Sequence, residues 1–160
     1  MDETGRDDVE TKLERDTVSA TTTVDAAPAD VFEFLRQPAN HAVLSGDSSV
    51  REAISGPDRL GPDDRFGMKM RIGVPYRVKS KVVEFEQDRR IAWCHFGGHR
   101  WRWDLEALPD GRTRVTETFD QSTALFPPGL RLAGFPRRHE SNVADSVANL
   151  AAHFAGDIRP

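Results

Sequence analysis

The sequence has only one cysteine, Cys94, so the chain cannot form a disulfide bond within itself. A single cysteine agrees with a reducing compartment, where disulfides are rare. The chain also lacks any stretch near the roughly 20 consecutive apolar residues that a membrane-spanning helix needs. Residues 1–16 have neither the basic start nor the apolar centre of a secretory signal peptide. We therefore expect a cytoplasmic protein without integral membrane association.

An excess of positive charge is lacking too, because 22 basic residues stand against 26 acidic ones. Residues 1–16 hold seven acidic and three basic residues, whereas residues 17–160 hold nineteen of each. Proteins that bind nucleic acids normally carry a basic excess. The composition therefore argues against a nucleic-acid partner. It predicts a disordered acidic leader over residues 1–15, followed by a single domain over residues 16–157.

Sequence motifs of several enzyme classes are absent. There is no G-x-S-x-G, P-loop or G-x-G-x-x-G pattern, so hydrolase, kinase and dinucleotide-dependent activities are not indicated. No H-E-x-x-H or paired C-x-x-C spacing supplies the ligands of a metal ion. Cys94 falls within a predicted strand and has no evident base. The sequence therefore predicts no metal site and no cofactor.

Alternation of apolar and polar residues is the main pattern that is present. Phe66, Met68 and Met70, for example, alternate with small or charged residues. A period of two is typical of strands with one buried face. We expect strands over residues 17–24, 50–55, 65–72, 76–86, 90–96, 99–108 and 113–122. A slip in phase at Val82 and Val83 indicates a bulge, which would bend a long strand around a core.

Helical patterns occur after the first strand and near the C-terminus. Residues 26–35, with Pro28 suited to a first helical turn, and residues 38–44 predict two short helices. Residues 136–155 predict a long amphipathic helix. Strands and one long helix bury their apolar faces together if the sheet curves around the helix. We therefore expect an α+β fold, a strongly curved antiparallel sheet of about seven strands wrapped around the C-terminal helix.

Four segments of this pattern resemble a known superfamily. They read DAAPADVF (residues 25–32), GVPYR (73–77), FGGHRWRWDLE (96–106) and TRVTETF (113–119). Over residues 17–155 the chain is similar to the SRPBCC superfamily of START-related helix-grip proteins, and to its bacterial polyketide cyclase/dehydrase-type branch. The resemblance implies a cavity between sheet and helix. Superfamily members include lipid carriers, hormone receptors and aromatic polyketide cyclases, so the use of the cavity stays open.

Residues at inward-facing positions are the predicted walls of this cavity. Bulky Met and amphipathic Trp side chains suit an apolar ligand, and Tyr76, His95, His99 and His139 could hydrogen-bond a ligand carbonyl or hydroxyl. His95 and His99 flank the Gly97-Gly98 turn and would lie opposite each other. Each residue could instead simply fill the core. The predicted ligand-binding residues are Met68, Met70, Tyr76, Val78, Trp93, His95, Trp101, Trp103, Phe119, His139, Val143 and Val147.

Glu117 is the one weak candidate for a catalytic residue. It shares inward parity with Val115 and Phe119, and a carboxyl group in an apolar pocket can act as a general acid or base. The alternatives are an ion pair with Arg100 or Arg102, or a register that points Glu117 outward.

Three functions are compatible with these features. The protein could bind a hydrophobic small molecule, lipid-like or aromatic, in the cavity. The same cavity could belong to an enzyme of the polyketide cyclase or dehydratase kind. A regulatory or assembly module would fill the pocket with its own Trp and Met side chains. The protein is expected to be a monomer or a homodimer.

Overall fold

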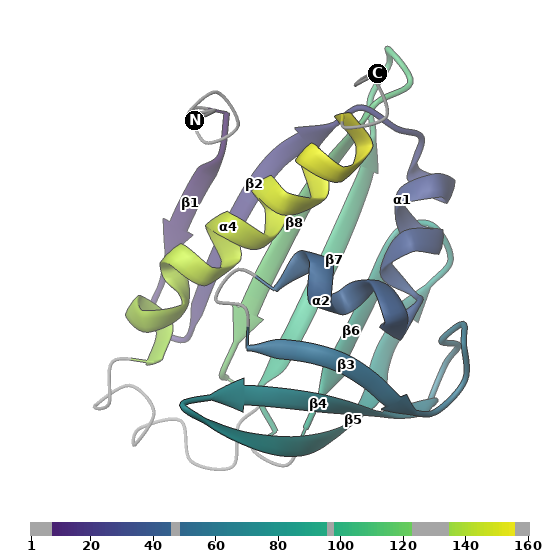
Figure 1. Cartoon of the computed structure of the whole chain (residues 1–160). Coiled ribbons are helices and arrows are strands. Elements are labelled where there is room, and N and C mark those ends of the chain that lie inside the picture. Colours follow the sequence, from purple (N-terminus) through teal and green to yellow (C-terminus); the bar gives the residue numbers. More distant parts are fainter. Residues whose placement is uncertain (1–7, 46–48, 96–97, 123–134, 156–160) are drawn as a thin grey trace.

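The computed structural model describes residues 8–45, 49–95, 98–122 and 135–155. Within these ranges the chain forms one antiparallel sheet of eight strands, in the order β1-β2-β8-β7-β6-β5-β4-β3 (Figure 1). The strands are β1 (Glu10–Leu13), β2 (Thr17–Val24), β3 (Val50–Ser55), β4 (Arg65–Ile72), β5 (Val74–Glu86), β6 (Arg90–Cys94), β7 (Arg100–Ala107) and β8 (Thr113–Asp120). The helices are α1 (Pro28–Leu35), the 3-10 helix η2 (Pro38–Asn40), α2 (His41–Leu44) and α4 (Phe135–Ala155).

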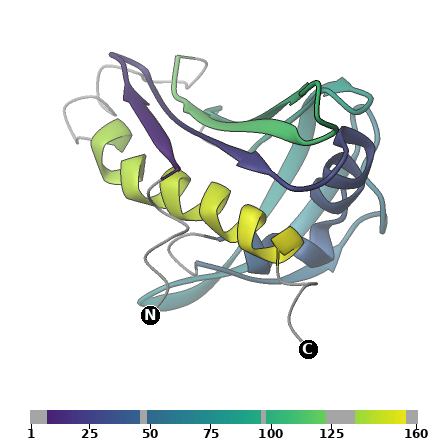
Figure 2. The ribbon, with the colours of Figure 1, turned by 90° about the horizontal axis from the view of Figure 1, so that it is seen from above.

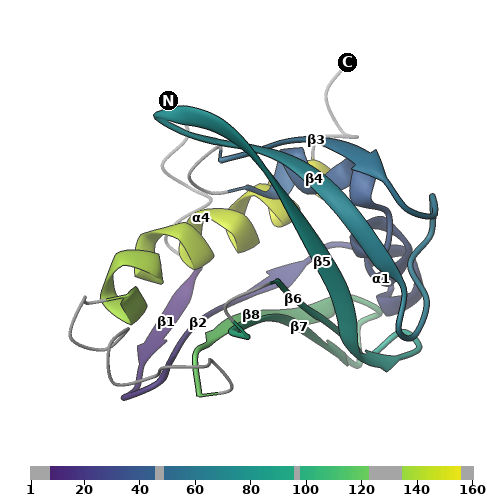
Figure 3. The same ribbon diagram turned by 90° about the horizontal axis from the view of Figure 1, so that it is seen from below.

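The sheet curves strongly and holds α4 on its concave side, as the two end-on views show (Figures 2 and 3). The pairing of β5 with β6 shifts register between Val82 and Glu84. This is the bulge that the sequence predicts, and it bends β5 around the core. The predicted α+β helix-grip fold is confirmed.

The core lies between α4 and the concave face of the sheet. Every second residue of β2 is buried, which is the period of two that the sequence shows. Opposite them, Val143, Val147 and Leu150 of α4 are fully buried at intervals of four and three residues. The apolar stripe of α4 therefore packs on the strands at the β2–β8 side of the sheet.

Strand β1 corrects one prediction. The sequence predicts a disordered leader over residues 1–15, of which residues 1–7 lie outside the described ranges, but Glu10–Leu13 pair along β2. Val9 packs against the core, and Thr11 Oγ1 donates a 3.5 Å hydrogen bond to Glu140 Oε1 of α4. All four strand residues are exposed, so a burial pattern could not reveal the strand. Backbone hydrogen bonds to β2 form it.

The short helices close one end of the curved sheet. Pro28 occupies the first turn of α1, and Val31, Phe32 and Leu35 are fully buried. The link from β3 to β4 is joined to this end, because the Leu60 N–H donates to Arg36 O at 2.7 Å. These contacts hold α1, η2 and α2 over the open end of the sheet.

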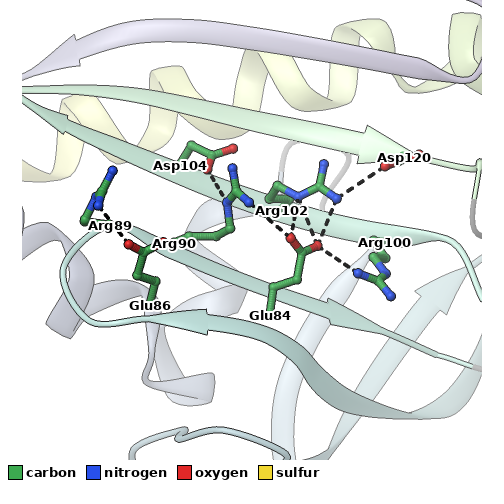
Figure 4. Close-up of polar contacts among 8 residues, drawn as sticks. All are labelled: Glu84, Glu86, Arg89, Arg90, Arg100, Arg102, Asp104 and Asp120. Carbon is green, nitrogen blue, oxygen red and sulfur yellow. Dashed lines mark hydrogen bonds and ion pairs between the residues drawn. The ribbon is translucent and has the colours of Figure 1, made fainter.

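The outer face of the sheet, away from α4, carries a network of ion pairs across β5, β6, β7 and β8 (Figure 4). Glu84 lies 3.0 Å from Arg100 and 2.8 Å from Arg102, which also contacts Asp120 at 3.3 Å. Burial opposes ionisation of Glu84, but hydrogen bonds from Arg102 and Arg100 outweigh it and hold the pKa of this carboxyl below its usual value. This part of the outer face is internally neutralised.

In the described part of the chain, no helix is long and apolar enough to cross a membrane.

Candidate functional site

A cavity of about 220 Å³ lies between the concave face of the sheet, α2 and α4. Strands β3 to β8 all contribute side chains to its wall, which is mainly apolar and aromatic. The sheet can enclose this space because it curves away from α4 on the β3–β4–β5 side, while the β2–β8 side packs directly on the helix (Figure 3). Curvature of the sheet therefore creates the cavity.

Most of the inward-facing residues expected from the sequence do line this cavity. They are Met68, Met70, Tyr76, Val78, Trp93, His95, Trp101, Trp103, Glu117 and His139. Phe66 and His99, also noted as inward-facing or as hydrogen-bonding candidates, line it too. Their contact with a ligand stays a prediction.

Three of the predicted ligand-binding residues lie elsewhere. Phe119, Val143 and Val147 are fully buried in the core and do not line the cavity. The Phe119 ring packs against neighbouring rings. Its centroid lies 4.7 Å from that of Trp101 and 4.3 Å from that of His139. Strand parity and helical spacing show which side chains point inward, but not which of these pack in the core and which line the cavity.

The structure also adds wall residues that the sequence did not indicate as ligand-binding. They come mainly from short or irregular segments and from the polar flank of α4: His41, Leu44, Ser45, Ser49, Val50, Ser80, Asn142 and Ser146. Among them only Ser80 has a sequence signal, since it shares the inward parity of Tyr76 and Val78. Helices as short as α2 show no periodicity from which a buried face could be predicted.

His41 is held in one tautomer. Its Nε2 lies 2.9 Å from the Leu35 carbonyl oxygen, which can only accept, so Nε2 carries the proton and Nδ1 is an acceptor. The imidazole stacks on Trp93 with ring centroids 4.5 Å apart. Burial lowers the pKa of His41 to about 4, against the smaller opposing effect of the Leu35 hydrogen bond. His41 is therefore neutral at physiological pH.

His95 and His99 lie against each other, as their positions around the turn predict. Their ring centroids are 4.8 Å apart with the planes nearly perpendicular, while Phe96 and Gly97 of the turn lie outside the described residues. Burial, and then the charge of His99, lowers the pKa of His95 to about 4. Burial also lowers the pKa of His99. Both rings are neutral hydrogen-bonding groups at neutral pH.

Trp103 and Glu117 face each other across the β7–β8 pairing, and both line the cavity. Trp103 is 1% exposed and Glu117 is 5% exposed. The Trp103 Nε1–H is buried and has no hydrogen-bond partner among the described residues. Arg100 and Arg102, the partners considered for Glu117, lie on the outer face and contact Glu84 instead. Glu117 points inward.

The described wall residues include one carboxyl group, several histidines and no Lys or Arg. Within the described ranges, no three His, Cys, Asp or Glu side chains are arranged to hold a metal ion. Chemically, the cavity offers apolar and aromatic surface, an indole N–H donor and a carboxyl group.

A curved antiparallel sheet that grips a long helix and encloses a cavity against it defines a helix-grip protein. The sequence matches the family model "Polyketide cyclase / dehydrase and lipid transport" over residues 15–155. The chain belongs to this family, which lies within the SRPBCC superfamily, and the predicted membership is confirmed.

The chain is similar to some proteins in sequence and to others in fold. The uncharacterised protein Rv0088 of Mycobacterium tuberculosis is 35% identical over 143 residues, which cover 86% of this chain. The match spans 64% of that relative's length. Protein NE0264 of Nitrosomonas europaea has a similar fold, with a TM-score of 0.70, 13% identity, and coverage of 89% of this chain and 96% of that one. The ZhuI aromatase/cyclase of Streptomyces sp. R1128 superposes with a TM-score of 0.64, 18% identity, and coverage of 94% and 97%.

Proposed function

We propose that the protein binds a hydrophobic small molecule in this cavity, and that the ligand is a compact ring compound bearing a hydroxyl or carbonyl oxygen. The observation that carries the proposal is the Trp103 N–H, a buried donor on the cavity wall without a partner in the described part of the chain. Leaving such a donor unpaired costs about 1–3 kcal/mol. A ligand oxygen would remove that cost.

The volume of the cavity supports a ligand of one or two rings. An apolar cavity of roughly 150 Å³ is known to take up benzene. At about 220 Å³ this cavity is larger, and a bicyclic aromatic suits it better than a lipid with two long chains. Stacking surfaces from Trp93, Trp101 and His41 favour a flat molecule.

The charges on the wall support a neutral ligand. Glu117 is a hydrogen-bond acceptor when ionised, and a ligand hydroxyl could donate to it. No described wall residue is a Lys or Arg that would compensate a ligand carboxylate. Burying an uncompensated charge is costly. A phenol-like compound therefore fits this wall better than a fatty acid.

The proposal is tested by calorimetric titration with three probes on one ring system: 2-naphthol, naphthalene and 2-naphthoate. We expect 2-naphthol to bind most tightly, naphthalene more weakly and 2-naphthoate least. Trp103→Phe keeps an aromatic ring and removes the donor. In that variant we expect the affinity for 2-naphthol to fall about tenfold while that for naphthalene changes little. Equal losses for both probes, or no binding of any probe, would contradict the proposal.

A polyketide cyclase or dehydratase-like enzyme is the second function, and the inward-facing carboxyl of Glu117 favours it. General acid or base chemistry needs such a group beside the bound substrate. The aromatase/cyclase among the structural neighbours is in keeping with this chemistry. Loss of water from a poly-β-ketone thioester, followed by mass spectrometry, tests it. The enzyme requires that Glu117→Gln abolish this turnover, whereas a carrier shows none in either form.

A module with a filled pocket is less well supported. Its own Trp and Met side chains would have to occupy the space, yet Met68, Met70 and three Trp side chains leave a cavity open between them.

A further inference from the structure

The outer face of the β4–β5 hairpin is strongly basic. Inward-facing Met68, Met70 and Val78 line the cavity, and the residues between them point to the opposite face of the sheet. Each outward strand position from Arg65 to Lys81, apart from Gly67 and Pro75, carries a positive charge. These residues, here called the basic strip, are Arg65, Lys69, Arg71, Arg77, Lys79 and Lys81, and all except Lys81 are exposed.

The pairing of the two strands brings like charges together. Lys69 lies directly opposite Arg77, and Arg65 lies opposite Lys81. Like charges at directly opposed positions destabilise a sheet. Two acidic residues lie close by: Glu52 opposite Lys69, and Asp63, which contacts Lys81 at 3.6 Å.

Five members of the basic strip have no ion-pair partner within the described ranges. They are Arg65, Lys69, Arg71, Arg77 and Lys79. The rest of the outer face is built differently, because Glu84, Asp104 and Asp120 in β5 to β8 are all paired with arginines (Figure 4). The charges on the outer face are thus balanced by ion pairs across β5 to β8, but not on the β4–β5 hairpin. The unbalanced half is suited to an anionic partner.

The tip of the same hairpin is apolar and exposed. Gly73 turns the chain with a φ of 72°, and Val74 next to it is 69% exposed. Tyr76 is 37% exposed and also lines the cavity, so it lies between the cavity and the solvent. Figure 3 shows β4 and β5 running along one side of the molecule to this tip. An apolar tip flanked by Lys and Arg is the composition of segments that dock at a lipid interface.

We propose that the β4–β5 hairpin docks the protein on the surface of an anionic lipid bilayer. The basic strip lies over the lipid phosphates, and Val74 enters the boundary between headgroups and acyl chains. Tyr76, on the cavity side of the hairpin and two residues from Val74, then lies near the bilayer surface at the edge of the cavity, where an apolar ligand dissolved in the membrane is at its highest concentration. A nucleic acid would also be attracted to the basic strip, but it would not bury the exposed Val74 in an apolar environment.

Co-sedimentation of the full chain with lipid vesicles tests this docking. We expect binding at low salt to vesicles of equal parts phosphatidylcholine and phosphatidylglycerol, and none to phosphatidylcholine alone. Each basic residue near an anionic surface contributes about fivefold in affinity. The Lys69→Gln/Arg77→Gln variant should therefore bind about 25-fold more weakly. Val74→Ser should also lose affinity.

Arg89→Gln/Arg112→Gln is the matched control, because it removes two exposed positive charges that are already paired with Glu86 and Asp110. We expect less than about a twofold change for it. Equal losses in both double variants would mean attraction by net charge and would overturn the proposal. An absence of vesicle binding would also overturn the proposal. If the protein were instead retained on polyglutamate through the hairpin, the partner would be an acidic protein. Titration with 2-naphthol should be unchanged in the Lys69→Gln/Arg77→Gln variant, so this test and that of ligand binding fail separately.

Discussion

The side chain of His41 joins stability to the cavity wall. It is 6% exposed, donates to the Leu35 carbonyl oxygen and stacks on Trp93. Because its pKa in the folded protein is about 4, against 6.5 for an ordinary histidine, the unfolded chain takes up a proton at a higher pH than the folded one. The free energy of unfolding therefore rises with pH between these two pKa values. The contribution of neutral His41 is fully present above the upper value.

We expect acid to weaken the fold well before the carboxylates titrate. Between neutral pH and about pH 5, His41 alone should lower the free energy of unfolding by about 1–2 kcal/mol. Urea unfolding at the two pH values measures the difference in the free energy of unfolding. In His41→Gln this difference should be smaller by about 1–2 kcal/mol. Exposed His153, substituted in the same way, is the control. A pH dependence that His41→Gln leaves intact would show that His41 is not the group responsible.

Sequence parity identified most of the cavity wall at this scale, including Trp103 and Glu117. It failed for His41 because the four residues of α2 are too short for a periodic pattern. It also assigned Phe119 and Val147 to the ligand, since neither strand parity nor helical spacing separates a residue that packs in the core from one that faces open space. Whether an inward-facing residue lines the cavity depends on where the curved sheet separates from α4.

Among the elements, α4 contributes most directly to the core. Leu150 is fully buried in the apolar stripe that packs against the sheet. Truncating it to Ala removes apolar contacts and leaves a void, so Leu150→Ala should cost about 2–5 kcal/mol in the free energy of unfolding. Ser141→Ala, at an exposed position of the same helix, should change stability by less than about 0.5 kcal/mol. Denaturant unfolding of both variants measures this, and equal stabilities would refute the packing of α4 described above.

Strand and helix positions could be predicted closely where one face is buried. The expected strand over residues 65–72 coincides with β4, and the bulge expected at Val82 and Val83 is present. β1 could not be predicted, because its residues are exposed on both faces and its order comes mainly from backbone pairing with β2. Alternation of burial is thus a reliable signal for strands that contact the core and none for an exposed edge.

For the whole molecule, composition conceals how charge is distributed. Residues 17–160 are balanced in charge, and a balanced composition argues against a nucleic-acid partner. Folding nevertheless gathers positive charges on the β4–β5 hairpin, while β5 to β8 neutralise theirs through ion pairs such as Arg102 with Glu84. Such a surface is visible only after strand register has brought Lys69 opposite Arg77.

Filling the cavity tests most directly whether it binds a compact ring compound. Ser146 is 5% exposed and lines the cavity from α4, whereas Ser141 on the same helix is exposed and does not line it. Calorimetric titration of Ser146→Leu and Ser141→Leu with 2-naphthol compares a side chain added inside with the same one added outside. We expect Ser146→Leu to lose at least about tenfold in affinity and Ser141→Leu to bind like the unaltered protein. Unchanged binding in a folded Ser146→Leu variant would contradict the account, since the ligand would then lie outside the cavity.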